Sequence, residues 1–120
     1  MAKTGLFDIA GHIVLIKVFK FMPNRDILEI AMPALRAIKE ADMVLEINVA
    51  GYRKPCEEPY PSPSILQAAY ELGIPITFGS DAHNPEQVGL FREEAQELAR
   101  SIGYSECATF KDRKRTMVAF

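Results

Sequence analysis

Short apolar runs alternate with amphipathic stretches along this chain, and that alternation restricts its fold more than any other feature. Residues 43–49 (MVLEINV) and 74–78 (IPITF) are nearly continuous apolar runs, which predicts strands covered on both faces. Residues 7–16 are rich in β-forming residues at both ends and are interrupted by Gly11 and His12. Apolar strands separated by helices predict an α/β fold, in which helices pack on a parallel sheet.

Three helices are expected between and after these strands. Residues 24–40 carry apolar side chains at helical spacing, and Pro33 inside them predicts either a kink or a helix that begins near it. A Ser-Pro pair opens residues 62–73, which predicts a capped helix ending at the Leu-Gly pair. The Asn-Pro-Glu-Gln sequence that opens residues 84–102 forms a capping box and predicts a third helix over part of that stretch.

Size and charge limit what the chain can be. Its 120 residues predict a single domain over 1–120, with 107–110 and 116–120 as terminal strands and a β-α-β-α-β-α-β order. A formal charge of -2 excludes the broad basic surface that a nucleic-acid partner requires. No apolar run approaches the roughly 20 residues of a membrane span. Without a recognisable signal peptide or a CxxC pair, a cytoplasmic protein with reduced thiols is expected.

Polar residues gather directly after the predicted strands. The three strands are followed by Gly11-His12, by residues 48–51 (NVAG) and by residues 80–83 (SDAH). Parallel strands bring their carboxyl ends to one rim of a sheet, where α/β proteins usually bind their ligands. The sequence therefore predicts a functional site at that rim.

The two histidines and one aspartate at this rim are candidate metal ligands. Asp81 and His83 are two positions apart, so they can direct an oxygen and a nitrogen toward one cation, and His12 is the only other histidine. Mixed oxygen and nitrogen ligands suit zinc, iron or manganese. The alternative is that Asp81 only caps the following helix, with His83 exposed beside it.

Other charged and polar residues surround these candidates. Glu46 and Asn48 share one face of the second strand, because side chains alternate along a strand. A carboxylate in a covered sheet needs a partner, which a cation, Lys17 or Arg53 would supply. Arg53 and Lys54 can also hold phosphate oxygens, the first as a planar fork and the second as a point charge. Ordinary solvated surface charge is the alternative for that pair.

Two further charged features carry less functional weight. Asp8 is a fourth candidate ligand, but its place within the first strand favours a structural role. The basic run Lys111, Arg113, Lys114 and Arg115 is interpreted as exposed charge without a function.

Five segments form a more specific combination. They are Gly11-His12, LEIN at 45–48, GYRKP at 51–55, EPYPS at 58–62 and GIPITFGSDAH at 73–83. Together they resemble the polymerase-and-histidinol-phosphatase (PHP) superfamily, and most closely its histidinol-phosphate phosphatases. The likeness runs from about Phe7 to Ile102. It implies parallel βα units like those in the C-terminal half of a distorted (βα)7 barrel, with a metal cluster at the carboxyl-terminal rim.

The resemblance also implies roles for individual residues. His12, Asp81 and His83 would be ligands of a divalent metal. Arg53 would contact phosphate, with Ser80 and Asn48 as supporting polar groups. Glu46 and Lys17 are expected around these residues, and Lys54 beside the phosphate. The implied reaction is the hydrolysis of L-histidinol phosphate in histidine biosynthesis, by a metal-activated water.

The chain departs from the family pattern in two ways. It lacks the family's His-x-His pair and the further His and Glu ligands that precede the matched region, and it has Val14 where the family usually has Asp. The second change is expected to leave Lys17 without its partner. We therefore expect a natural or engineered fragment, weakly active or inactive alone, whose uncovered edges favour a homodimer or larger assembly. The alternative is a non-catalytic, self-associating half-barrel with a partial metal or phosphate site.

Overall fold

A three-stranded parallel sheet forms the centre of the computed structural model, which describes residues 1–15 and 26–120. Its strands are β1 (Ile9–Ala10), β2 (Val44–Asn48) and β3 (Ile76–Gly79), in the order β1-β2-β3. Leu45 in the central strand is paired with Ala10 on one side and with Ile76 on the other. These parallel strands confirm the α/β fold expected from the apolar runs.

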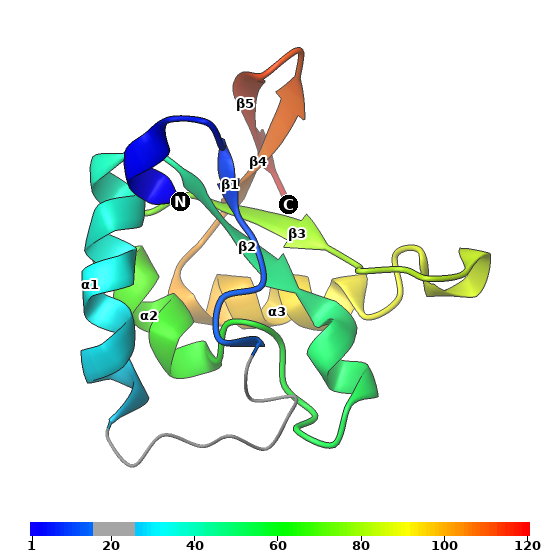
Figure 1. Ribbon diagram of the computed structural model, residues 1–120. Helices are drawn as coiled ribbons and strands as arrows, with labels where there is room; N and C mark the ends of the chain where they lie inside the picture. Colours follow the sequence, from blue (N-terminus) through cyan, green and yellow to red (C-terminus); the bar gives the residue numbers. More distant parts are fainter. Residues whose placement is uncertain (16–25) are drawn as a thin grey trace.

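Three helices lie against this sheet and share one hydrophobic core with it (Figure 1). They are α1 (Ile27–Glu40), α2 (Pro63–Glu71) and α3 (Arg92–Ile102). The buried helix residues of this core are Ala31, Leu35, Ile38, Ile65, Leu66, Ala69, Ala95 and Ala99. Because side chains alternate along β2, Leu45 and Ile47 enter the core while Glu46 and Asn48 belong to the other face. No helix within the described ranges is long and apolar enough to span a bilayer.

The second helix begins where the Ser-Pro pair predicts, whereas the first begins after Asp26, a cap that was not predicted from the sequence. Asp26 caps α1, since its Oδ1 accepts a hydrogen bond from the Leu28 N–H at 2.9 Å. The helix continues on both sides of Pro33, which is exposed, so the alternative of a helix beginning near Pro33 is wrong. Ser62 and Pro63 occupy the cap and first position of α2.

The third helix begins later than the capping box predicts. A short 3-10 turn, η4 (Pro85–Gln87), follows Asn84, and α3 begins only at Arg92. Asn84 makes no capping bond through its side chain. The Gln87 side chain accepts a hydrogen bond from the His83 N–H and not from the Asn84 N–H, so the capping box is not formed.

The last two strands form a separate antiparallel hairpin, β4 (Glu106–Lys111) and β5 (Lys114–Ala119). The two terminal strands expected over 107–110 and 116–120 are present, but they pair with each other and do not join the parallel sheet. Two strands joined by only two residues must run antiparallel, because a parallel pair needs a long crossover. Asp112 and Arg113 make that connection with φ values of 51° and 61°, as the tight hairpin turn requires.

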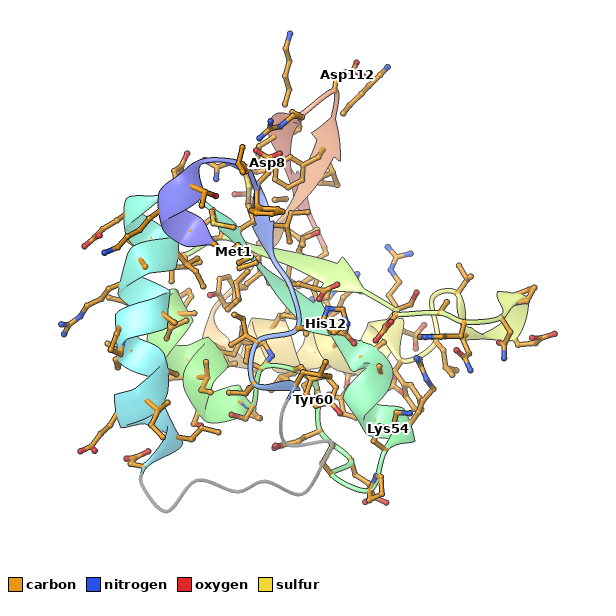
Figure 2. All side chains as sticks on the ribbon, viewed as in Figure 1. Met1, Asp8, His12, Lys54, Tyr60 and Asp112 are labelled. Atoms are coloured by element: carbon orange, nitrogen blue, oxygen red, sulfur yellow. The ribbon has the colours of Figure 1, made fainter. Side chains whose placement is uncertain are left out.

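Two arginines of the hairpin are tied to the amino-terminal ends of the parallel strands. Arg113 donates to both carboxylate oxygens of Asp8, from Nε at 2.9 Å and from a terminal nitrogen at 3.1 Å. Arg115 binds both carboxylate oxygens of Asp42 at 3.0 Å. Asp8 lies just before β1 on the side of the hairpin tip, whereas His12 lies beyond the other end of β1, farther from the hairpin (Figure 2). The basic run is exposed, as expected from the sequence, but two of its arginines are paired with carboxylates, which was not predicted from the sequence.

Replacement of Arg113 by glutamine is expected to raise the pKa of Asp8 toward its ordinary value of 3.8, because the Arg113 hydrogen bonds hold it lower. A depressed folded-state pKa means that the pair stabilises the fold above the ordinary pKa. That contribution is lost as the pH falls through the folded-state pKa. The free energies of unfolding of the two proteins in urea should therefore differ near neutral pH and converge as the pH falls through the folded-state pKa of Asp8.

Carboxyl ¹³C NMR titration follows Asp8 directly. The control is Lys114→Gln, which removes the same charge from a neighbouring position without removing the Asp8 partner. Identical Asp8 titrations in the wild type and in Arg113→Gln would show that the ion pair does not form.

Candidate active site

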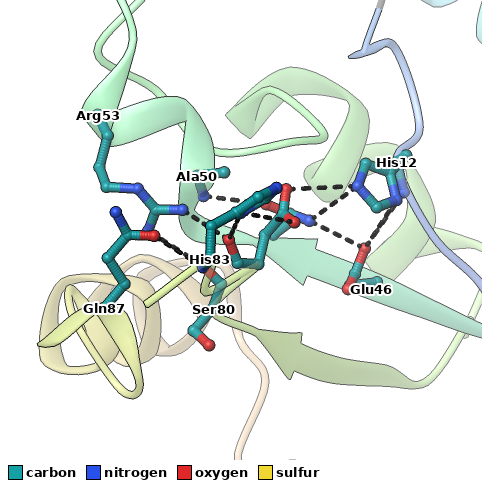
Figure 3. Close-up of polar contacts among 9 residues, drawn as sticks. His12, Glu46, Ala50, Arg53, Ser80, His83 and Gln87 are labelled. Carbon is teal, nitrogen blue, oxygen red and sulfur yellow. Dashed lines mark hydrogen bonds and ion pairs between the residues drawn. The ribbon is translucent and has the colours of Figure 1, made fainter. Parts of the chain in front are cut away.

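The carboxyl-terminal ends of the three parallel strands bring the predicted polar residues together (Figure 3). His12 follows β1, Asn48 ends β2, and Asp81 and His83 follow β3. These positions agree with the rim predicted from the sequence. Lys17, expected near the same rim, lies outside the residues that the structure describes.

Glu46 lies across the sheet between two glycines of the neighbouring strands. A Cβ atom at Gly79 would overlap Glu46 Oε1, and a Cβ at Gly11 would lie 3.0 Å from Oε2. The same Oε2 accepts hydrogen bonds from the His12 N–H at 3.2 Å and from Asn48 Nδ2 at 3.3 Å. The two glycines thus provide the room in which this largely buried carboxylate meets its donors.

His12 stands between two carboxylates. Its Nε2 lies 3.4 Å from Asp81 Oδ2, and its Nδ1 lies 3.9 Å from Glu46 Oε2. Asn48 Nδ2 approaches the same Nε2 at 3.5 Å. His12 has a φ of 56°, an uncommon value for a residue with a side chain, so the backbone turns sharply where it delivers the ring to the rim.

His83 is held by its neighbours although its side chain is 78% exposed. Its Nδ1 lies 2.8 Å from the main-chain oxygen of Asp81, and its N–H donates to Gln87 Oε1 at 2.9 Å. In the tautomer that donates from Nδ1, Nε2 keeps its lone pair and faces outward as a possible ligand. Sequence reasoning assigned Gln87 to a capping box and missed this contact, which its four-residue distance from His83 could have suggested.

Asn48 supports this arrangement from inside the protein. It is wholly buried, and its Oδ1 accepts the Ala50 N–H at 2.9 Å, which caps the short helix η3 (Val49–Arg53). Its main chain exchanges two hydrogen bonds with Tyr60. Its observed partners are therefore protein groups, and a direct contact with substrate stays a prediction.

Tyr60 closes the base of the loop that follows η3. Its side chain is buried, and its hydroxyl lies 3.6 Å from Cys56 Sγ. Burial, and then the contact with Cys56, raise the pKa of Tyr60 far above its usual value of 10.0, so the hydroxyl remains protonated. Sequence reasoning gave this tyrosine no individual role.

Arg53 reaches from the end of η3 to the loop after β3. It donates to the main-chain oxygens of Ser80 at 3.0 Å and Asp81 at 2.9 Å. The sequence suggested Arg53 as a partner for Glu46, but the contacts of Glu46 described above are with His12 and Asn48. Lys54, the other predicted phosphate contact, is exposed beside Arg53.

The donor atoms at this rim are suited to a transition metal, but they form an incomplete set. His12, His83, Asp81 and Glu46 offer the imidazole nitrogens and carboxylate oxygens that zinc, iron and manganese accept. Within residues 1–15 and 26–120, however, no three His, Cys, Asp or Glu side chains are grouped closely enough to hold an ion. The described rim therefore does not bring three of these donors together, and His12, Asp81 and His83 remain predicted metal ligands.

A groove of about 330 Å³ runs beside the same rim. Residues 77–79 of β3 and the following Ser80 form one wall, while Leu90, Arg92 and Cys107 contribute to the others. Burial raises the pKa of the Cys107 thiol, which keeps it protonated and unsuited to act as a nucleophile. The groove thus offers polar and apolar surface next to the loop that carries Asp81.

Comparisons with known proteins agree with this geometry. A family model described as PHP-associated matches residues 64–103. The probable histidinol-phosphatase of Deinococcus radiodurans is 40% identical over 113 residues, which cover 94% of this chain and 42% of that protein. The histidinol-phosphatase of Lactococcus lactis is 33% identical over 82% of this chain and 35% of its own length.

A solved structure agrees as well. The putative histidinol phosphatase hisK from Listeria monocytogenes superposes with a TM-score of 0.58 and 34% identity, over 72% of this chain and 35% of that one. The chain belongs to the PHP superfamily. It corresponds to a C-terminal part of the PHP histidinol phosphatases, and its βα units form a partial PHP barrel. It spans between 29% and 42% of the length of the curated relatives that it matches.

The glycines beside Glu46 give this PHP rim a testable packing requirement. Gly79→Ala is expected to lower the free energy of unfolding by about 1–3 kcal/mol, because the new methyl group overlaps the Glu46 carboxylate. Glu46→Ala removes the obstructing atoms, so the same substitution should cost less in that background. Urea unfolding of the two single variants and the double variant measures this coupling.

The matched comparison is Gly11→Ala, whose methyl group would approach Glu46 less closely and should cost less. Strictly additive effects of Gly79→Ala and Glu46→Ala would contradict the contact.

Proposed function

We propose that this chain carries part of the active site of a metal-dependent phosphatase that hydrolyses L-histidinol phosphate, and that alone it is weakly active or inactive. The observation that carries the proposal is the meeting of His12 and Asp81 at 3.4 Å, next to Glu46, at the ends of adjacent strands. The printed names of the relatives, which are histidinol-phosphatases, supply the substrate class. A cytoplasmic location stays a prediction from the sequence.

His12, Asp81 and His83 would hold a divalent metal, either zinc, manganese or iron. When bound, such an ion lowers the pKa of a coordinated water and neutralises charge on phosphoryl oxygens. Glu46 accepts the His12 N–H and so fixes the turn that presents the imidazole. The main-chain oxygen of Asp81 accepts from one terminal nitrogen of Arg53 and lies next to Nδ1 of His83. The Asp81 carboxylate remains close to His12.

Arg53 and Lys54 would bind the phosphoryl group. Arg53 uses two of its five N–H donors on main-chain oxygens, which leaves donors for an anion at the same rim. Lys54 adds a positive charge on the adjacent residue, and Ser80 lies between the Arg53 contact and the groove. Hydrolysis would transfer the phosphoryl group from the histidinol oxygen to water, and the released alkoxide takes up a proton.

A second candidate function is favoured by the incomplete donor set. The described residues include no group of three potential ligands, and the chain spans less than half the length of its relatives. A folded, non-catalytic half-barrel that retains a partial metal or phosphate site agrees with both observations.

Metal binding and phosphate release separate these two functions. The purified chain is expected to bind one Mn²⁺ or Zn²⁺, with an affinity that falls about 10–100-fold in Asp81→Ala or His83→Ala, because each change removes a donor. Calorimetry measures the binding, and release of phosphate from histidinol phosphate measures the activity. Asp112→Ala, at the far hairpin tip, is the matched control.

Turnover that exceeds the metal-only background and disappears in His83→Ala would reject the non-catalytic alternative. A metal-free protein whose metal uptake is unaffected by Asp81→Ala and His83→Ala would contradict the metal site itself.

We also propose that the chain self-associates through the outer edge of β3. Within the described sheet β3 is paired only with β2, so alternate N–H and C=O groups of its other edge have no strand partner. The groove beside that edge is lined in part by Leu90, which is 39% exposed. A strand of a second copy would satisfy these main-chain groups and cover the apolar wall.

Light scattering over a concentration series tests this proposal, and a mass of at least twice 13.4 kDa is expected. Leu90→Lys should shift the protein toward monomer, because it places a charge in the groove. Val88→Lys should not, since Val88 is already 72% exposed and does not line the groove. A monomer at every concentration would contradict the proposed self-association.

A further inference from the structure

The position of Arg53 is fixed by a buried strand end. Asn48, the last residue of β2, accepts the Ala50 N–H through its side chain and so starts η3, and Arg53 is the last residue of that short helix. Since Asn48 is wholly buried and anchored to Tyr60 by two main-chain bonds, η3 begins from a rigid base. The guanidinium is therefore delivered to one place rather than sampling the solvent.

From that place, Arg53 holds the main chain of the loop after β3. Its two terminal nitrogens donate to the oxygens of Ser80 and Asp81, which are consecutive residues, at 3.0 and 2.9 Å. Two parallel N–H donors on a planar fork match two adjacent acceptors, a geometry that a lysine ammonium does not reproduce. The contact is therefore specific for arginine and not only for positive charge.

The loop that Arg53 holds includes an uncommon backbone conformation. Asp81 has a φ of 50°, in the left-handed region, which is uncommon for residues with side chains although Asp adopts it more often than most. The residues between β3 and η4 belong to no helix or strand. The Asp81 main-chain oxygen that Arg53 binds also lies 2.8 Å from His83 Nδ1. A change in the position of this oxygen would therefore alter the orientation of both Asp81 and His83.

We propose that Arg53 is a positioning residue that holds the Asp81–His83 loop in its left-handed conformation and thereby aims both side chains at the rim. Its relevance to metal binding rests on the proposed function, but the loop contact itself exists without metal. A role in phosphate binding through the remaining donors is compatible with this one. Arg53→Lys distinguishes the two roles. Lysine keeps the positive charge that phosphate binding needs, but it cannot bind both main-chain oxygens of the loop.

The loop conformation of the metal-free full chain gives the direct test. NMR is used to measure the amide-to-α-proton coupling and the Cα shift of Asp81, together with the amide exchange of residues 80–83. In both Arg53→Lys and Arg53→Ala the left-handed signature should be lost, and loop exchange should quicken about tenfold or more. Arg36→Lys, an exposed change of the same type on α1, is the control and should alter neither. Unchanged exchange in β2 shows that each variant is folded.

Mn²⁺ titration of the same proteins links the loop to the proposed site. Arg53→Lys and Arg53→Ala should both weaken Mn²⁺ binding about tenfold or more, as expected for a residue that orients ligands without touching the ion. Wild-type loop signals and Mn²⁺ affinity in Arg53→Lys would overturn the proposal in favour of a charge role. A wild-type loop that does not show the left-handed signature would overturn it as well. If the wild type binds no Mn²⁺, the proposed metal site fails while the loop measurements still decide the role of Arg53.

Discussion

The buried amide of Asn48 is the contact on which the rest of the rim depends. It lies at the end of the central strand and donates to Glu46, while its oxygen starts η3. Glu46 in turn fixes the main chain at His12, and η3 carries Arg53 to the loop of Asp81. A buried amide left without these partners would carry a desolvation cost, so the network favours one arrangement of three loops. The positions of the polar groups at the rim thus depend on a wholly buried residue.

Much of this organisation could be predicted from local patterns. The apolar runs gave β2 and β3 within one or two residues, and the Ser62-Pro63 pair gave the start of α2. The rim followed from a general property of parallel sheets, because it requires only that strands end where polar residues begin. For that reason His12, Asp81 and His83 could be assigned to one end of the molecule before any coordinates were known.

Two kinds of contact could not be predicted from the sequence: those between residues far apart in the chain, and those made to main-chain atoms. The pairing of Arg113 with Asp8 joins positions 105 residues apart, and a basic run contains no sign of which acid it meets. Arg53 binds carbonyl oxygens, which every residue possesses, so no side chain marks its target. The start of α3 was misplaced for a related reason, because Gln87 could bond either of two adjacent amides and the sequence does not distinguish them.

The ion pairs between the hairpin and the residues Asp8 and Asp42 affect the order in which the molecule can fold during synthesis. Synthesis runs from the amino terminus, so the residues of β1 emerge long before Arg113 and Arg115 exist. The ion pairs of Asp8 and Asp42 therefore cannot form until Arg113 and Arg115 have been synthesised. Bringing together residues so far apart in the chain is entropically costly and slow. The hairpin itself forms locally, so Arg113 and Arg115 reach their partners as one preformed unit. In this chain Arg113 thus binds Asp8, which is synthesised 105 positions earlier.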